Sequence, residues 1–224
     1  MKTFLLTATY LVGIGELALA VFFWVTHSKS EIRKVMALLA FSVSSWVILS
    51  AIIAYLPNLK IGLHIDDFIY IAGVLLTTAL LHFSLIYPFP LFRIDNVHRL
   101  LLYIPALLFS VISLSSRLLV SSYYASTTFV GNIVGGPLYP YYNWYLTVLY
   151  VLSLVILFYK QRRLDGFQQK NIRIMFFSIL IAGFPAVYTD LLAPMLGWPL
   201  PNFLLGVLSS VFWLGPTSYI VLKK

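Results

Sequence analysis

The sequence contains no cysteine, which removes disulfides, thiolate metal sites and cysteine nucleophiles but leaves the redox compartment open. Charged residues are also scarce: they make up 10% of the 224 residues, against about 25% in soluble domains. Hydrophobic residues make up 61% and the mean hydropathy is +0.93. A soluble fold of this size would have too little polar surface, whereas a lipid-embedded protein exposes its outer face to hydrocarbon.

Motifs for several chemistries are missing too. The sequence has no glycine-rich phosphate loop, no GxSxG and no HExxH. No two of the four histidines are spaced as metal ligands on a helix; they are His27, His64, His82 and His98. A retinal pigment needs a lysine within its last span, but here that span has only Lys223 and Lys224 at its very end. We therefore expect no catalytic residues, no metal and no cofactor.

Acidic residues are few, and seven of them against fifteen basic residues give a formal net charge of +8. In a soluble protein this excess would suggest nucleic acid. In so apolar a chain it indicates orientation in a membrane and contact with anionic lipid headgroups, so lipids and not nucleic acid are the expected partners.

Seven runs are long and apolar enough to cross a bilayer, which takes about 20 mostly apolar residues. The predicted spans are Phe4–Thr26, Val35–Leu56, Phe68–Tyr87, Leu100–Val120, Trp144–Tyr159, Ile174–Leu192 and Phe203–Leu222. The fifth is short, and we expect the aromatic run from Tyr139 to extend it. Pro105, Pro185 and Pro216 lie within spans and predict kinks or irregular turns. The chain is thus predicted to be a single all-α membrane domain, residues 1–224, with seven transmembrane helices.

The basic residues of the loops indicate the orientation. Twelve of the fifteen follow spans one, three, five and seven, and the opposite side has only Lys2, Lys60 and Arg117. Because cytoplasmic loops carry the excess of Lys and Arg, this distribution places the N-terminus outside and the C-terminus in the cytoplasm.

The longest predicted outer loop is the fourth, residues 121–143, which is uncharged and rich in Tyr, Thr and Gly. Thr127–Val130 and Ile133-Val134, on either side of Gly131-Asn132, are typical of a small hairpin that would act as a lid. A loose loop in an interfacial aromatic belt is the alternative.

Four stretches carry a resemblance to a known family: LHFSLIYP (81–88), RRLDGFQQKNIRIMFFSILIAGFP (162–185), YTDLLAPMLGWPLPN (188–202) and SYIVLKK (218–224). In order and spacing they resemble the N-terminal seven-transmembrane sensor region of bacterial histidine kinases, which related signalling proteins such as diguanylate cyclases share. The resemblance covers nearly the whole chain.

The resemblance implies a sensor module in the bacterial plasma (inner) membrane. Such a module detects an unknown small ligand or a membrane property and signals through its last helix to a cytoplasmic kinase or other output domain. It also implies a homodimer, because the kinase cores of this family are dimeric. No kinase or cyclase motif is present up to Lys224, so the chain itself is not expected to be an enzyme.

Ionisable residues at membrane depth are costly and are functional candidates by default. Glu16, His82, Arg117 and Asp190 fall in this class. At about 1.5 Å per residue, Glu16 and His82 lie at similar depth and are candidates for a pair, as are Arg117 and Asp190 near the outer surface. The alternatives are hydrogen-bonded packing for His82, snorkelling to headgroups for Arg117 and a capping role for Asp190.

Two further patterns concern packing. Trp46 and Trp213 are the deepest of the five tryptophans and either line an apolar ligand site or pack in the core. Small residues in span one, such as Gly13, and in span six, such as Gly183, would let neighbouring helices approach closely.

Three functions compete. A receptor module is favoured by the resemblance and by the prolines of the late spans. A transporter or channel would use Glu16, His82 and Asp190 as a polar path, although seven spans do not divide into inverted repeats. A membrane enzyme ranks last, because no acid, base and nucleophile gather on one side of the membrane.

Overall fold

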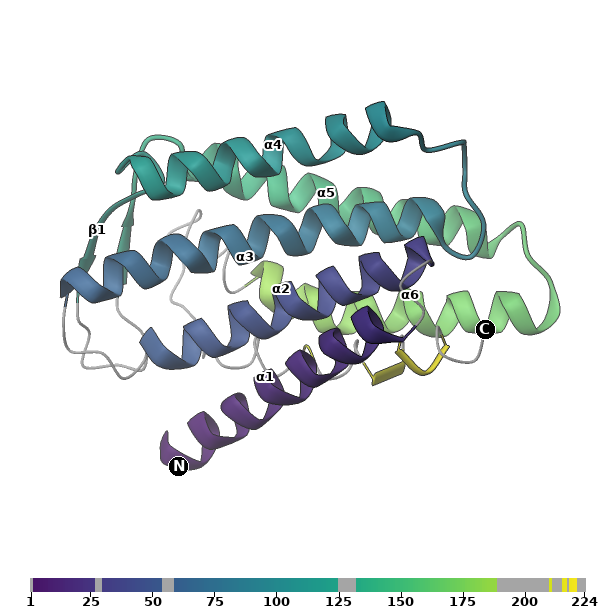
Figure 1. Ribbon diagram of the computed structural model, residues 1–224, viewed down its shortest axis with the longest axis horizontal. Helices are drawn as coiled ribbons and strands as arrows, with labels where there is room; N and C mark the ends of the chain where they lie inside the picture. Colours follow the sequence, from purple (N-terminus) through teal and green to yellow (C-terminus); the bar gives the residue numbers. More distant parts are fainter. Residues whose placement is uncertain are drawn as a thin grey trace.

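The computed structural model describes residues 2–26, 30–53, 59–124, 132–188, 210, 215–216 and 218–220. Within these residues six long helices and one small hairpin follow in chain order (Figure 1). They are α1 (Lys2–Val25), α2 (Glu31–Ile53), α3 (Leu59–Ile86), α4 (Asn96–Ser115), β1 (Val120–Tyr124), β2 (Asn132–Gly135), α5 (Tyr139–Gln161) and α6 (Gly166–Ala186).

Helices α3 to α6 run roughly along the long axis, while α1 and α2 lie side by side at a steeper angle to it (Figure 1). Because successive helices reverse direction, α2, α4 and α6 begin at the end where α3 and α5 finish. We call this the basic end, since Arg99, Arg162 and Arg163 lie there. The opposite end, with the β1–β2 pair, is the hairpin end.

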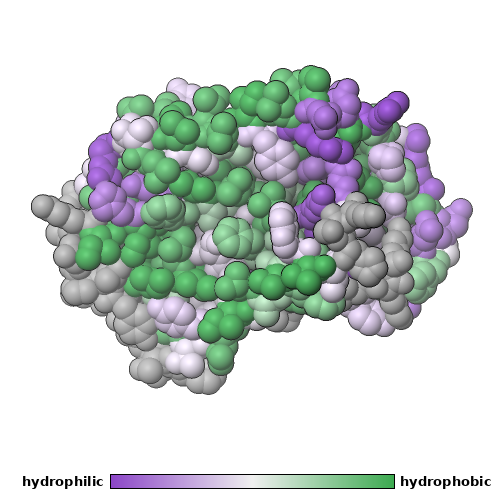
Figure 2. All heavy atoms as spheres, viewed as in Figure 1, coloured by the Kyte–Doolittle hydropathy of each residue, from purple (hydrophilic) through white to green (hydrophobic). Residues whose placement is uncertain are grey.

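Among the described residues, five helices, α1 to α5, are long and apolar enough to cross a membrane. Their exposed residues fit that environment: on α4 the exposed apolar side chains are Val97, Leu100, Leu101, Ile104, Leu107, Leu108, Val111 and Leu114. In Figure 2 hydrophobic residues cover the middle of the visible face, and hydrophilic residues gather toward its ends. An apolar surface of this extent is stable against hydrocarbon but not against water.

The core has two parts. The larger cluster draws on α1, α2, α3, α5 and α6, with Phe23, Met36, Phe83 and Met175 among its fully buried members, and it includes Ile220 of the last predicted span. The smaller cluster joins α3, α4 and α5 around Tyr142.

Close helix approach occurs at two of the glycines singled out in the sequence. A Cβ on Gly13 of α1 would lie 2.6 Å from Cγ1 of Ile48 on α2, and the Gly13 carbonyl accepts a hydrogen bond from Ser44 Oγ at 2.7 Å. A Cβ on Gly183 of α6 would collide with the Tyr150 ring of α5. Both positions confirm the expected role of small residues in packing.

The helix boundaries correct several predicted spans. Helix α3 begins nine residues before Phe68 and α6 begins eight before Ile174, whereas α4 ends at Ser115, five residues before Val120. The predicted extension of the fifth span to Tyr139 is confirmed. Pro105 lies inside α4 without ending it, and a wider, π-type turn at 187–188 follows Pro185. Most of the predicted seventh span lies outside the described residues.

The predicted hairpin is present, but its first strand is displaced. Val120–Tyr124, rather than Thr127–Val130, pairs antiparallel with Asn132–Gly135, with an irregularity between Val120 and Ser122. Residues 125–131 lie outside the described part of the chain.

Candidate functional site

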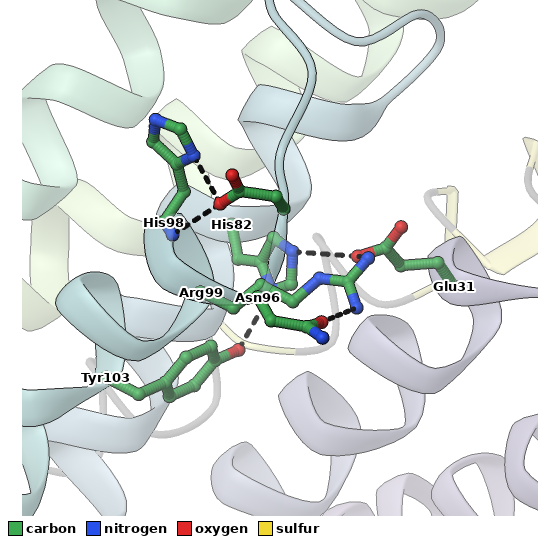
Figure 3. A network of polar contacts seen from close by, with 7 residues as sticks. Glu31, His82, Asn96, His98, Arg99 and Tyr103 are labelled. Atoms are coloured by element: carbon green, nitrogen blue, oxygen red, sulfur yellow. Dashed lines mark hydrogen bonds and ion pairs between the residues drawn. The ribbon is translucent and has the colours of Figure 1, made fainter.

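The most connected group of polar side chains lies at the basic end and joins three helices (Figure 3). Glu31 is the first residue of α2, where the helix dipole favours a carboxylate. Its Oε1 lies 2.8 Å from Arg99 Nη2 of α4 and 3.3 Å from His82 Nε2 of α3. One carboxylate oxygen thus bridges α2, α3 and α4. We call Glu31, His82, Arg99 and Tyr103 the basic-end network.

His82 is the buried centre of this network, with only 4% of its surface exposed. Its Nδ1 lies 3.1 Å from the hydroxyl of Tyr103 on α4, and the two rings meet edge to face at 5.7 Å. The opposite ring nitrogen faces Glu31 at ion-pair distance, without the alignment of a hydrogen bond. Each ring nitrogen of His82 therefore contacts a different helix.

The start of α4 is fixed by a local cap next to the network. The Asp95 carboxylate accepts a hydrogen bond from the backbone N–H of His98 at 2.9 Å and contacts His98 Nδ1 at 2.6 Å. The bond from the His98 backbone lowers the pKa of Asp95, and the His98 side chain adds to this effect. Arg99 also approaches the Asn96 side chain, at 3.4 Å.

Lys160 of α5 forms the second polar junction at this end. The side chain is fully buried, and its ammonium donates to the carbonyls of Leu85, Tyr87 and Phe89 at 2.9, 2.9 and 2.6 Å. A lysine has three N–H donors, so all three are satisfied at the end of α3 and in the turn that follows it. The ammonium also lies 5.1 Å from the centre of the Phe89 ring. Lys160 thereby fixes α5 to the end of α3.

Glu16 lies in the interior of the bundle, 4% exposed. Its Oε1 accepts a hydrogen bond from Ser210 Oγ at 2.6 Å, and its Oε2 has no hydrogen-bond partner within the described part of the chain. Ser210 belongs to the last predicted span, so the contact joins the first and last spans across 194 residues of sequence.

A third polar group lies at the hairpin end. Asp67 of α3 is 3.9 Å from Arg117, which follows α4, and 3.9 Å from His64 on its own helix. The Asp67 backbone carbonyl accepts a hydrogen bond from Ser113 of α4 at 3.2 Å. These contacts connect the ends of α3 and α4 that the predicted orientation places outside the membrane.

The family model for the N-terminal 7TM region of histidine kinase matches residues 8–223. The chain belongs to this family. No curated protein is significantly similar to it. The match confirms the resemblance drawn from the sequence and supports a multi-pass membrane protein with the role of a sensor region, which is not a catalytic domain.

In this member of the histidine kinase sensor family, the partners of the predicted site residues differ from those expected. Glu16 contacts Ser210 instead of His82, and His82 contacts Glu31. The depth predicted for His82 was wrong, because it was counted from Phe68 whereas α3 begins at Leu59, and His82 lies about one turn before the end of α3 at Ile86, near the basic end. Arg117 contacts Asp67, with half of its side chain exposed.

Of the remaining predicted site residues, only Trp46 lies within the described part of the chain. It belongs to the larger core cluster, with 9% of its surface exposed. Asp190 and Trp213 lie outside the described residues. Among the described residues, no three of His, Cys, Asp and Glu gather as metal ligands.

Four residues of the sensor domain that matter for these junctions were missed in the sequence: Glu31, Arg99, Tyr103 and Lys160. One feature of the sequence could have singled out Glu31: it is a rare acidic residue in a basic loop, at the start of an apolar run. Arg99 and Lys160 were counted only as loop charges that set the orientation.

Proposed function

We propose that this domain is the input module of a histidine-kinase-type signalling protein. It detects an extracellular or membrane-borne signal and transmits it through its last helix to a cytoplasmic output domain or partner. Membership of the sensor family supports the first half of this proposal, and the polar contacts of the bundle support the second.

The observation that carries the proposal is the basic-end network. Four side chains connect α2, α3 and α4 at one end of a bundle whose remaining contacts are mostly apolar. A ligand can shift a conformational equilibrium only through an element with two discrete arrangements that it binds differently. The ion-paired network at the ends of three helices is our candidate for such an element, because a change in helix packing would make or break it as a unit.

The contact between Glu16 and Ser210 supports the route out of the membrane. It attaches the last predicted span to α1, while Ile220 packs into the same core as α2 and α3. Movement among the first helices would therefore reach the segment that leads to the cytoplasm. We place the domain in the bacterial plasma membrane, with the hairpin end outside, in contact with lipids, and as a homodimer when attached to a dimeric kinase core.

The test uses the chain fused at its C-terminus to a histidine kinase core in proteoliposomes. Arg99→Gln removes the ion pair with Glu31, and we expect basal autophosphorylation to change at least about fivefold, as coupling energies between sites suggest. Arg173→Gln, which removes an exposed basic residue of α6, is the matched control. If the two variants phosphorylate equally, the network does not transmit the signal.

A transporter or channel remains the second candidate because of Glu16. A buried carboxyl with one oxygen unpartnered among the described residues is typical of proton and ion pathways. Ion or proton flux into liposomes that disappears in Glu16→Gln would favour this function over the receptor. Absence of flux in the unaltered protein would remove it.

A further inference from the structure

Two adjacent carboxylates, Asp66 and Asp67, are buried near the start of α3, with 6% and 4% exposed. Asp67 is matched by Arg117 and by His64, each at 3.9 Å. Asp66 has no ion pair, and its Oδ2 has no hydrogen bond, among the residues that the structure describes. One of the two acids is therefore left without a compensating cation from the described chain.

A buried ionised carboxylate is unstable unless it is paired. Asp66 has two ways to avoid this cost, which are to bind a proton or to bind a cation. The surroundings of the side chain decide between them.

Aromatic rings surround the next turn of α3. Tyr70 follows Asp66 by four residues, so the two side chains lie on the same face of α3. The Tyr70 ring meets Tyr139 and Tyr142 of α5 edge to face, at 6.1 and 5.1 Å. Clusters of aromatic rings are the recurring binding surface for organic ammonium groups, and a carboxylate on the same helix face would attract the positive charge.

Strand β2 of the hairpin packs on one of these rings, that of Tyr139. A Cβ on Gly135 of β2 would lie 2.7 Å from the Tyr139 ring, so the strand packs directly on it. One turn further along α5, Asn143 is fully buried, and neither atom of its amide has a hydrogen-bond partner in the described ranges. Asp66 and Asn143, whose side chains carry these unpartnered atoms, thus lie one helical turn from Tyr70 and from Tyr139 respectively.

We propose that Asp66, with Tyr70 and Tyr139, forms a binding site for a small organic ammonium compound. Asp66 pairs with the positive charge, the tyrosine rings contact its alkyl substituents, and Asn143 is placed to hydrogen-bond a polar group of the ligand. A hard metal ion fits less well, because it requires six or more oxygen ligands and no group of three metal-ligating side chains occurs in the described ranges. The role of this ligand as the stimulus of a sensor rests on the function proposed above.

The test is isothermal titration calorimetry of the full chain in lipid nanodiscs. The probes are choline and ethylammonium, with 3,3-dimethylbutan-1-ol as the uncharged isostere of choline. We expect at least one ammonium probe to bind saturably and the alcohol not to bind. Equal heats for choline and the alcohol, or no binding of either ammonium probe, would overturn the site.

Two neighbouring carboxylates provide a matched pair of variants. Asp66→Asn should weaken ammonium binding at least about thirtyfold, as loss of one member of a buried charge pair does. Asp67→Asn should change it by less than about threefold, because the charge of Asp67 is already compensated by partly exposed Arg117. Equal effects of the two substitutions would contradict the assignment to Asp66.

Should Asp66→Asn fail to fold, Tyr139→Leu tests the aromatic part of the site. It should weaken choline binding about fivefold or more, and unchanged affinity would contradict the proposal. Calorimetry also separates this site from the proposed function. Binding without any change in autophosphorylation of the kinase fusion would leave the site intact and count against the receptor, while a responsive fusion without ammonium binding would do the reverse.

Discussion

Lys160 carries an ammonium group into a buried position, where three backbone carbonyls replace its hydration. Lys160→Met keeps most of the side-chain volume but removes the three hydrogen bonds that the ammonium donates to these carbonyls. We expect a loss of about 2–4 kcal/mol in the free energy of unfolding, because hydrogen bonds from a charged donor contribute about 1.5–3 kcal/mol each. Unfolding in detergent, followed by circular dichroism, measures this loss. Lys170→Met, at an exposed position of α6, should leave stability within about 0.5 kcal/mol.

Asp95 gives a pH dependence with a definite sign. The backbone N–H of His98 holds the pKa of Asp95 below its ordinary value of 3.8. The stabilisation of the α4 N-terminus is therefore fully present above pH 3.8 and is lost as the pH falls through the lowered pKa. Carbon-13 NMR of the carboxyl should show a titration midpoint below 3.8, and a midpoint at or above that value would contradict the cap.

Two asparagine variants separate the cap from general acid effects. Asp95→Asn keeps a hydrogen-bond acceptor but cannot titrate, so the start of α4 should lose its acid dependence. Asp165→Asn alters the N-cap of α6, whose side chain makes no capping bond, and should leave the acid dependence of α4 unchanged.

The burial of individual residues could be predicted better than their contact partners. The scarcity of charge correctly marked Glu16 and His82 as buried, but their partners come from segments distant in sequence: Ser210 for one, and Glu31 and Tyr103 for the other. Helical spacing determines which residues share a face of one helix. It does not determine which helices meet.

At the scale of the element, the contact between α1 and α2 gives a paired prediction. Gly13→Ala places a Cβ 2.6 Å from Ile48 Cγ1, so the helices must separate or the isoleucine must shift. We expect a loss of about 1–3 kcal/mol in the free energy of unfolding, typical of overpacking. Gly15→Ala, two residues away, meets nothing within 4 Å and should stabilise α1 slightly. Equal stabilities in detergent would show that α1 does not approach α2 so closely.

The helices were predicted most accurately where their ends are apolar and least accurately where they are polar. Helix α1 differs from its prediction by two residues at the start and one at the end. The prediction placed the start of α3 nine residues too late. The reason is a group of polar residues typical of a loop: Lys60, His64, Asp66 and Asp67. Hydropathy cannot reveal that Arg117, which follows α4, compensates the Asp67 carboxylate, or that Ser113 of α4 donates to the Asp67 backbone carbonyl. The candidate ammonium site was missed for the same reason.

For the whole molecule, the basic end and the hairpin end differ in the charges that they present. Arg99, Arg162 and Arg163 lie at the basic end, while Arg117 is the arginine next to the hairpin. Since basic loops remain in the cytoplasm, the hairpin and the candidate ammonium site should face outward, where an extracellular ligand would reach them.

Because the chain has no native cysteine, single introduced thiols report this orientation without background. Val134→Cys lies on the exposed surface of β2, and Asp165→Cys lies in the exposed turn between α5 and α6. In intact cells, a membrane-impermeant maleimide should label the first variant and should label the second only after the membrane is opened. The reverse pattern would place the basic-end network outside, where it could not control a cytoplasmic kinase. Labelling of both variants in intact cells would mean that the chain inserts in two orientations, which a charge difference this large opposes.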